Sequence, residues 1–307
     1  MSTKIIKKIK SGTIFNRFKA ANEKQRFVFI VLLPSLLFFA FFSVIPIFYA
    51  FYISFFEMNF LDTPVFVGVN NYIRNFNDPH ILSSLKVTFK FAFSTIFIGG
   101  FLAFVFALLM NSIKKGAAIF RTIYFLPVMT SLVSMAVIWG WLYQPRFGLI
   151  NSFLGLFGIG RQMWLASPDT ALGSVIASSI WQGMGFTIII FLAGIQAIPQ
   201  SFYEAAEVDG ASKLQKVWYI TIPLLRPTFI FLLITGFIGG LQVFDQLYVM
   251  AGNGPLNSTR GFIQLLYQRA FSYYQMGRAA SMAFLLFAII VVFTIIQFKI
   301  TSKKVDY

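Results

Sequence analysis

The chain carries few residues that could perform chemistry. It has no cysteine and a single histidine, His80. Thiol nucleophiles, disulfides, thiolate metal sites and clusters of histidine ligands are therefore excluded. Asp245 is the one acidic residue that lies clearly inside a long apolar run, whereas a membrane-embedded enzyme needs several acid–base or metal-binding groups that converge. These observations argue against catalysis and against a metal site, and His80 is expected to be a solvated loop residue.

Neutral polar and aromatic side chains within the apolar runs form a second group of interest. They are Trp181, Gln182 and Phe186 in one run and Thr235, Gln242 and Asp245 in the next. Amides and a carboxylate can bind hydroxyl groups, and aromatic rings stack on sugar rings, so the set suits a carbohydrate pathway. A route for anions or metal ions would normally place more charge in the runs. The competing interpretation is that each residue serves helix packing or the membrane interface, which is the commoner role of these residue types.

The elements that position these side chains must be membrane spans. Of 307 residues, 58% are hydrophobic and only 11% are charged, which lies outside the range of soluble domains. An α-helix needs about 20 apolar residues to cross the hydrocarbon core. Six runs qualify: Phe27–Phe56, Val87–Met110, Ile119–Leu142, Leu172–Ile198, Thr228–Met250 and Ala279–Ile300. Because strand-type alternation is absent, we expect an all-α polytopic membrane protein with six transmembrane helices rather than a barrel.

The distribution of basic residues predicts the orientation. A net charge of +15 could indicate nucleic-acid binding, but Lys and Arg lie between the apolar runs instead of gathering in a solvated patch. Basic residues accumulate on the cytoplasmic side of a membrane. If the amino terminus is inside, the segments on the cytoplasmic side hold most of the Lys and Arg residues. Both termini are therefore predicted to be cytoplasmic. The loop from Ala251 to Arg278 is the exception, with three arginines and no acid. Either an acidic partner meets these arginines, or the rule is only statistical there.

This distribution divides the chain into three parts. Residues 1–26 are expected to form a basic cytoplasmic segment, residues 27–300 a six-span membrane domain, and residues 301–307 a cytoplasmic tail. The first apolar run is too long for a signal peptide and has no small-residue cleavage site, so it is expected to remain as a span.

One charged stretch lies between the fourth and fifth apolar runs: "YEAAEVDGASKLQKVWYITIPLLRP", Tyr203–Pro227. Ser201 and Glu204 have the spacing of a capping box, which predicts the start of a helix. Gly210 suits a left-handed cap at its end, and Ser212 can begin a second helix. The sequence therefore predicts two short helices on the cytoplasmic side, within a loop that covers residues 199–227.

Proline and apolar residues define the rest of this loop. Pro223 and Pro227 are expected to end the second helix before the fifth span. Val208 and Trp218 would give the two helices an apolar surface that needs a partner. That partner is either another subunit or the chain's own bundle, and the pattern alone does not decide between them.

The same stretch resembles a known sequence motif. Glu204-Ala205-Ala206, Gly210, Ile220 and Ile222-Pro223 have the spacing of the EAA loop in permease subunits of binding-protein-dependent ABC importers, with Ile222 in place of the usual leucine. The stretches "FVGVNNY", "RTIYFLPVMTSLVSMAVIWGWLY" and "FDQLYVMAGNGP" are similar to the sugar-permease branch, the maltose and multiple-sugar permease family. The resemblance covers nearly the whole chain and is weakest in the first forty residues or so.

The resemblance implies a type I importer fold and a specific set of partners. These are a second, similar permease, two cytoplasmic ATPase subunits that bind ATP and magnesium, and an extracellular binding protein that delivers a di- or oligosaccharide through a bacterial cytoplasmic membrane. The residues that would couple this chain to an ATPase are Glu204, Ala205, Ala206, Asp209, Gly210 and Pro223. This chain is not expected to be an enzyme or to bind a cofactor, since it contains no Gly-Lys pair that could hold a nucleotide phosphate.

Two alternatives stay open for the activity. The first is the same kind of permease with another cargo, glycerol phosphate or a polyamine. A phosphate predicts an arginine in the pathway and a polyamine predicts clustered acids, and neither is visible in the runs. The more distant alternative is a secondary transporter, which commonly shows internal repeats or broken helices and has no use for an EAA loop.

Overall fold

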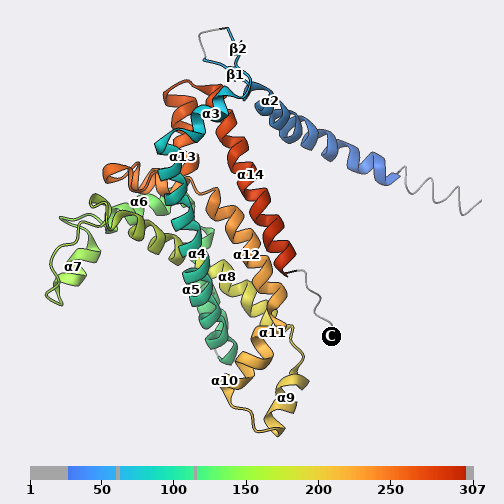
Figure 1. Cartoon of the computed structure of the whole chain (residues 1–307). Coiled ribbons are helices and arrows are strands. Elements are labelled where there is room, and N and C mark those ends of the chain that lie inside the picture. Colours follow the sequence, from blue (N-terminus) through green and yellow to red (C-terminus); the bar gives the residue numbers. More distant parts are fainter. Residues whose placement is uncertain (1–26, 60–62, 114–115, 302–307) are drawn as a thin grey trace, which may run out of the picture.

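The computed structural model describes residues 27–59, 63–113 and 116–301, and the described chain is almost entirely helical (Figure 1). The predicted segment 1–26 lies outside the described residues, as does 301–307 apart from the backbone of Thr301. In chain order the elements are η1 (Ala40–Val44), α2 (Ile45–Ile53), β1 (Phe56–Glu57), β2 (Val65–Phe66), α3 (Asn70–Phe76), α4 (Pro79–Ser112), α5 (Ala117–Phe125), η2 (Leu126–Met129), α6 (Leu132–Leu142), α7 (Leu149–Gly155), η3 (Trp164–Ala166), α8 (Ala171–Gln196), α9 (Gln200–Val208), α10 (Lys213–Lys216), η4 (Val217–Thr221), α11 (Ile222–Leu224), α12 (Arg226–Leu241), η5 (Gln246–Ala251), η6 (Pro255–Asn257), α13 (Phe262–Tyr267), η7 (Gln268–Ser272) and α14 (Met276–Thr301).

Within the described residues, four helices are long and apolar enough to cross a membrane. They are Phe27–Ile53, Pro79–Ser112, Ala171–Gln196 and Met276–Ile300. Two bent helix pairs, Ile119–Met129 with Leu132–Leu142 and Lys213–Leu224 with Arg226–Leu241, raise the number to six if each pair counts as one span. The predicted helical membrane fold is confirmed, with four to six candidate spans.

The second span begins earlier than predicted. α4 starts at Pro79 rather than near Val87, because the Asp78 side chain accepts a hydrogen bond from the His80 backbone N–H and caps the helix. Its 34 residues make a helix about 51 Å long, at 1.5 Å per residue. Hydrocarbon is only about 30 Å thick, so α4 is longer than a perpendicular crossing requires.

The third and fifth spans are broken, which the apolar pattern did not predict. In the third, the helix axes on the two sides of Thr130 and Ser131 meet at 98°. The Thr130 hydroxyl donates to the Pro127 carbonyl and stabilises the turn. In the fifth, α12 ends at Leu241 and the π-helical turn η5 starts at Gln246. A continuous helix from Thr228 to Met250 is therefore wrong.

The interior of the bundle lies along α4, which packs against α8 and α12. In the part of the bundle nearer to α9, the rings of Phe104, Phe191 and Phe229 contact one another at centroid distances of 4.9–5.4 Å. Further along, Gly240 of α12 faces Ala92 of α4, and a Cβ placed on Gly240 would lie 2.9 Å from the Ala92 Cα. Small residues thus let the two backbones approach closely, as in other membrane helix pairs.

The two ends of the bundle differ in structure. Helices α9 and α10 form one end, and the two-residue strands β1 and β2 lie at the other with α3 and α13 (Figure 1). We call these the α9 end and the strand end. β1 and β2 pair antiparallel, with Phe56 opposite Phe66.

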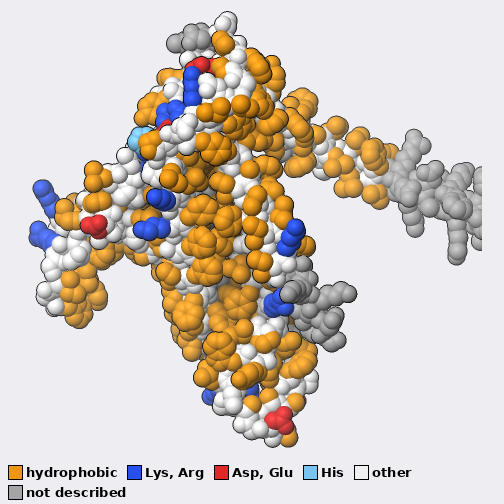
Figure 2. Space-filling view, in the orientation of Figure 1, with side chains coloured by type: hydrophobic (Ala, Val, Ile, Leu, Met, Phe, Trp, Pro, Cys, Tyr) orange, Lys and Arg blue, Asp and Glu red, His pale blue; other side chains and the backbone are white. Residues whose placement is uncertain are grey.

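The first helix stands apart from the bundle. Helix Phe27–Ile53 runs away from the strand end, and its most apolar window buries none of its residues (Figure 1). Figure 2 shows hydrophobic side chains along this helix and over much of the visible bundle. Such a surface requires an apolar environment.

Candidate functional site

The charged loop folds into two short helices at the α9 end. α9 begins at Gln200 and has Pro199 as its N-cap residue, without a side-chain cap. Ser201 therefore lies inside the first turn, and the predicted capping box of Ser201 with Glu204 is wrong. Gly210 follows α9 with φ +74°, the left-handed conformation that glycine adopts without strain.

The second helix begins at Ser212 as predicted. The Ser212 hydroxyl accepts from the Gln215 backbone N–H, and the Gln215 side chain accepts from the Ser212 backbone N–H, which completes a capping box. The helix continues to Leu224 and bends by 63° before α12 begins at Arg226. Its end thus lies between Pro223 and Pro227.

Polar contacts join the two helices of this element, and apolar contacts attach it to the bundle. The Tyr203 hydroxyl on α9 lies 3.0 Å from the Thr221 hydroxyl on the second helix. Val217 and Ile222 pack against the core cluster of α4 and α8, in which Leu225 is fully buried. Lys216 and Glu207 form an ion pair of 2.6 Å between the two helices, and this hydrogen bond lowers the pKa of Glu207. The element therefore has a defined position relative to the spans.

The outward surface of the element stays exposed. Val208 is 89% exposed and Trp218 is 61% exposed, so the interpretation that these residues pack against the chain's own bundle is wrong. Glu204, Ala205, Asp209, Gly210 and Pro223 are exposed as well, and Ala206 is half-buried. We call this the coupling surface, which comprises Glu204, Ala205, Ala206, Val208, Asp209, Gly210, Trp218 and Pro223.

The predicted pathway residues of α8 lie on different faces of that helix. Trp181 and Phe186 are exposed, whereas Gln182 is 6% exposed on the stripe that packs in the bundle. The Trp181 ring contacts Trp139 of α6 edge-on at 5.5 Å, and Trp139 lies 5.3 Å from Tyr143. Of these contacts, the one between Trp139 and Trp181 joins α6 to α8.

The predicted pathway residues of the fifth span lie at and before its break. Thr235, Gly239 and Gln242 are exposed on one side of α12, since residues three and four apart share a helix face. Gln242 follows the last helical residue, and Asp245 directly precedes the π-helical turn η5. Non-helical backbone at membrane depth occurs where it is buried in protein or lines a cavity. The break therefore places non-helical backbone beside the polar side chains of Gln242 and Asp245.

A buried ion cluster at the strand end was not predicted. Asp78 pairs with Arg269 and Arg278, each at 2.6 Å. Burial alone would raise the pKa of Asp78, but the His80 backbone N–H and the charges of Arg269 and Arg278 outweigh it and hold that pKa below its ordinary value. The acidic partner of the arginine-rich loop is thus in the same chain.

The third arginine of that loop meets the histidine. Arg260 is 8% exposed, and its Nη2 lies 2.9 Å from His80 Nδ1. Because a guanidinium can only donate, the histidine nitrogen is the acceptor of this hydrogen bond. His80 is solvent-exposed, as expected, but it lies on the first turn of α4 rather than in a loop.

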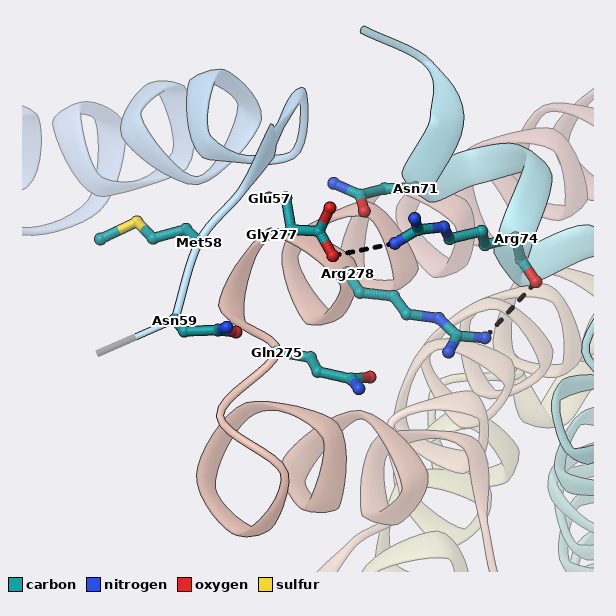
Figure 3. A pocket seen from close by; sticks show the side chains of 8 residues that line it. All are labelled: Glu57, Met58, Asn59, Asn71, Arg74, Gln275, Gly277 and Arg278. Atoms are coloured by element: carbon teal, nitrogen blue, oxygen red, sulfur yellow. Dashed lines mark hydrogen bonds and ion pairs between the residues drawn. The ribbon is translucent and has the colours of Figure 1, made fainter. Parts of the chain in front are cut away.

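Beside this cluster, a small cavity of about 50 Å³ opens between β1, α3 and α14 (Figure 3). The side chains of Glu57 and Arg74 form an ion pair of 3.0 Å across it, and Arg278 donates to the Arg74 carbonyl. The cavity is too small for a sugar, so we interpret it as a packing gap. Within the described residues, no group of three or more potential metal ligands is found.

Comparison with known proteins identifies the class. Residues 95–305 match the family described as binding-protein-dependent transport system inner membrane component. Because the match covers more than half of the chain, this protein belongs to that family. It is a multi-pass component of the inner membrane, as the apolar helices require.

The individual relatives that this chain resembles are permease proteins of ABC transporters. The chain is 36% identical to the probable ABC transporter permease protein YesP of Bacillus subtilis, over 89% of this chain and 90% of that protein. It is 34% identical to the trehalose/maltose transport system permease protein MalF of Thermococcus litoralis, over 94% of this chain and 98% of the relative. The predicted resemblance to ABC sugar permeases is confirmed.

A solved structure supports the fold. A chain in the crystal structure of a bacterial ABC transporter involved in the import of the acidic polysaccharide alginate superposes with a TM-score of 0.84 at 22% identity. The match covers 94% of this chain and 100% of the other. At this identity the likeness concerns the fold.

Proposed function

We propose that this chain is a permease subunit of an ATP-driven ABC importer that carries a di- or oligosaccharide delivered by an extracellular binding protein. The observation that carries the proposal is the exposed coupling surface with its EAA sequence on a chain of this family. Its relatives in Thermococcus litoralis and Bacillus subtilis are named as trehalose/maltose and arabinooligosaccharide permeases. ATP and magnesium would bind to partner ATPase subunits.

In this proposal the coupling surface docks in a groove of an ATPase subunit. Exposed small alanines permit close approach, and Glu204 can meet a basic residue of the partner. The Tyr203–Thr221 contact joins the two helices of the element, and Leu225 anchors the element in the core of the bundle, so movement of an ATPase would be passed on to α8 and α12 as rigid bodies. This role places both termini and the α9 end in the cytoplasm, with six spans in total.

A second permease would complete the pathway. Helix Phe27–Ile53 has exposed apolar side chains on all sides and leaves the bundle (Figure 1). Such a helix suits an arrangement in which it crosses the membrane against a partner subunit as well as lipid. The pathway residues Trp181, Phe186, Thr235, Gln242 and Asp245 would face the other half across the interface, and Gln182 would support α8 from its buried side.

ATPase measurements on the assembled complex in lipid test the proposal. The complex is assayed with binding protein and a panel of sugars, and wild type is compared with Glu204→Ala and Gly210→Val. We expect a sugar to stimulate hydrolysis and both variants to reduce the stimulation at least about tenfold, since each disturbs a surface that would carry the coupling. Gly210→Val acts through its positive φ, because no atom would lie within 4 Å of the new Cβ.

Glu57→Ala is the matched control, because Glu57 is also an exposed glutamate but lies at the strand end. It should leave the stimulation unchanged. If the Glu204 and Gly210 variants also behave like wild type in complexes of normal composition, the coupling assignment is wrong.

The second candidate cargo is glycerol phosphate. A relative of 28% identity is named as the sn-glycerol-3-phosphate permease UgpA of Pectobacterium atrosepticum. The same ATPase assay separates the two cargoes: stimulation by glycerol phosphate and by no sugar would replace the carbohydrate assignment.

A further inference from the structure

A segment with one short helix, α7, stands out sideways from the bundle between α6 and α8 (Figure 1). It spans residues 145–162, contains α7 and is called here the α7 projection. Its exposed residues include Phe147, Leu149, Phe153, Leu156 and Phe157, which are 60–80% exposed. None of the residues from 145 to 162 is acidic, and Arg146 and Arg161 lie close to its two ends.

The α7 projection is a built element rather than a loose loop. The Asn151 amide donates to the carbonyls of Pro145 and Gln162, and its oxygen accepts from the Gln162 backbone and from the Trp164 indole. These four bonds join the two ends of the α7 projection. Gly158 takes φ +73° where the chain turns back after α7, and the Ile159 N–H donates to the Leu154 carbonyl there.

The apolar side chains share one face of this element. Leu149, Phe153, Leu156 and Phe157 recur at helical spacing, whereas Asn151 is 8% exposed on the inward side. The Phe153 and Phe157 rings touch at 5.3 Å. Figure 2 shows hydrophobic side chains gathered at the end of the projection and basic side chains set apart from them at its edge. An apolar face with basic flanks is the composition of segments that lie in a membrane interface.

The base of the projection forms an amphipathic cavity. It has a volume of about 720 Å³, and its lining includes Arg146 and Arg161 beside Trp141, Met163 and Met250. Both arginines are exposed and could bind a phosphate, and the apolar lining suits the adjoining acyl chain. Trp141, at 68% exposure, extends the apolar surface of α6, so this surface continues from a span to the projection.

We propose that the α7 projection lies in the membrane interface and binds an anionic phospholipid, with its apolar face among the acyl chains and the headgroup phosphate between Arg146 and Arg161. Charge and position select lipid as the occupant: the face is cationic at both flanks, lacks acids and continues the surface of α6. The inference needs only that the projection meets one membrane surface. It is therefore independent of the cargo and of the ATPase partner.

Site-directed spin labelling tests the apolar contact. Because the chain contains no cysteine, Leu156→Cys gives it a single label site, and Val65→Cys, at an exposed position of β2 at the strand end, is the comparison site. The full chain with its partner subunits is reconstituted in nanodiscs, and collision with oxygen and with a water-soluble nickel chelate is measured. We expect the Leu156 label to be accessible to oxygen and shielded from nickel, and the Val65 label to show the reverse preference.

Two results of this labelling would overturn the proposal. Nickel access at Leu156 equal to that at Val65 would place the face in water. Shielding of Leu156 from both oxygen and nickel would show that protein, such as a second permease or a binding protein, covers the face instead of lipid.

Retention of phosphatidylglycerol over phosphatidylcholine, measured by native mass spectrometry, tests the headgroup contact. Removing both charges with Arg146→Gln and Arg161→Gln should reduce this preference by about fivefold per residue. The matched control is Lys86→Gln with Lys90→Gln, which removes two exposed charges from α4 and should leave the preference unchanged. Equal effects of the two double variants, or no effect of the arginine pair, would refute a headgroup site.

Discussion

Asp78 joins two parts of the chain that are far apart in sequence. Its partners Arg269 and Arg278 follow it by 191 and 200 residues, and all three side chains are at most 17% exposed. A buried ion pair of this kind adds little stability over a pair of apolar residues, but removing one partner destabilises the fold because it leaves the other charges uncompensated. Asp78 therefore holds the start of α4 against η7 and α14.

Replacement of Asp78 tests this role. Asp78→Asn should lower the free energy of unfolding by about 2–4 kcal/mol, because two partly buried arginines lose their counter-charge. Thermal unfolding of the purified protein measures the loss. Glu57→Gln removes an exposed pair with Arg74 and should cost less than about 1 kcal/mol; equal losses in the two variants would contradict the assignment.

The same carboxylate predicts a pH dependence. The pKa of Asp78 is lower in the folded chain than its ordinary value of 3.8. A depressed pKa contributes stability that is present above the ordinary value and is lost as pH falls through the folded value. The difference in stability between wild type and Asp78→Asn should thus be constant near neutral pH and shrink below about pH 3.8. A difference that already shrinks between pH 7 and 5 would point to another group.

The sequence predicted part of this residue-level picture. The EAA spacing selected residues that lie on the exposed surface at the α9 end, and their coupling role stays a prediction. The loop with three arginines and no acid raised the need for an acidic partner. Asp78 itself could not be found by pattern, because the pairing depends on how α4 and α14 pack and no local spacing records it. The Ser201 cap failed because Pro199 starts the helix two residues earlier.

Among the elements, α4 and α12 depend on glycine at their contact. Gly240→Ala should destabilise the bundle by about 1–3 kcal/mol, since the new methyl group would overlap the backbone of α4. Gly239→Ala is the matched control, because a Cβ there has nothing within 4 Å. Thermal unfolding of both variants in one detergent is the measurement, and an equal response at the two positions would show that the close approach is unimportant.

Element positions were predictable where apolar length alone decides them. The fourth run, Leu172–Ile198, agrees with α8 within two residues. The broken spans were missed, because an apolar run looks the same whether its helix is straight or bent at Thr130 by 98°. Gln242 and Asp245 were selected for their polarity, and that polarity coincides with the break between α12 and η5.

For the whole molecule, the exposed first helix predicts dependence on a partner. Expressed alone, the chain should be recovered in lower amount and as a mixture of aggregates, because helix Phe27–Ile53 buries none of the residues of its most apolar window. Co-expression with a second permease should raise the amount and give one species, since binding stabilises the bound form by mass action. Membrane abundance and size-exclusion profiles measure this. A monodisperse chain at full abundance without a partner would contradict the prediction.

The position of α4 at the centre of the bundle also has a consequence for biosynthesis. Its main neighbours, α8 and α12, lie beyond residue 170, and ribosomes add about 5–20 residues per second. For several seconds a newly inserted α4 must stay in the bilayer before either neighbour exists, with Thr88 and Ser84, which the finished bundle buries, still uncovered. The rate of translation through residues 113–170 thus sets how long the membrane insertion machinery must shelter this helix.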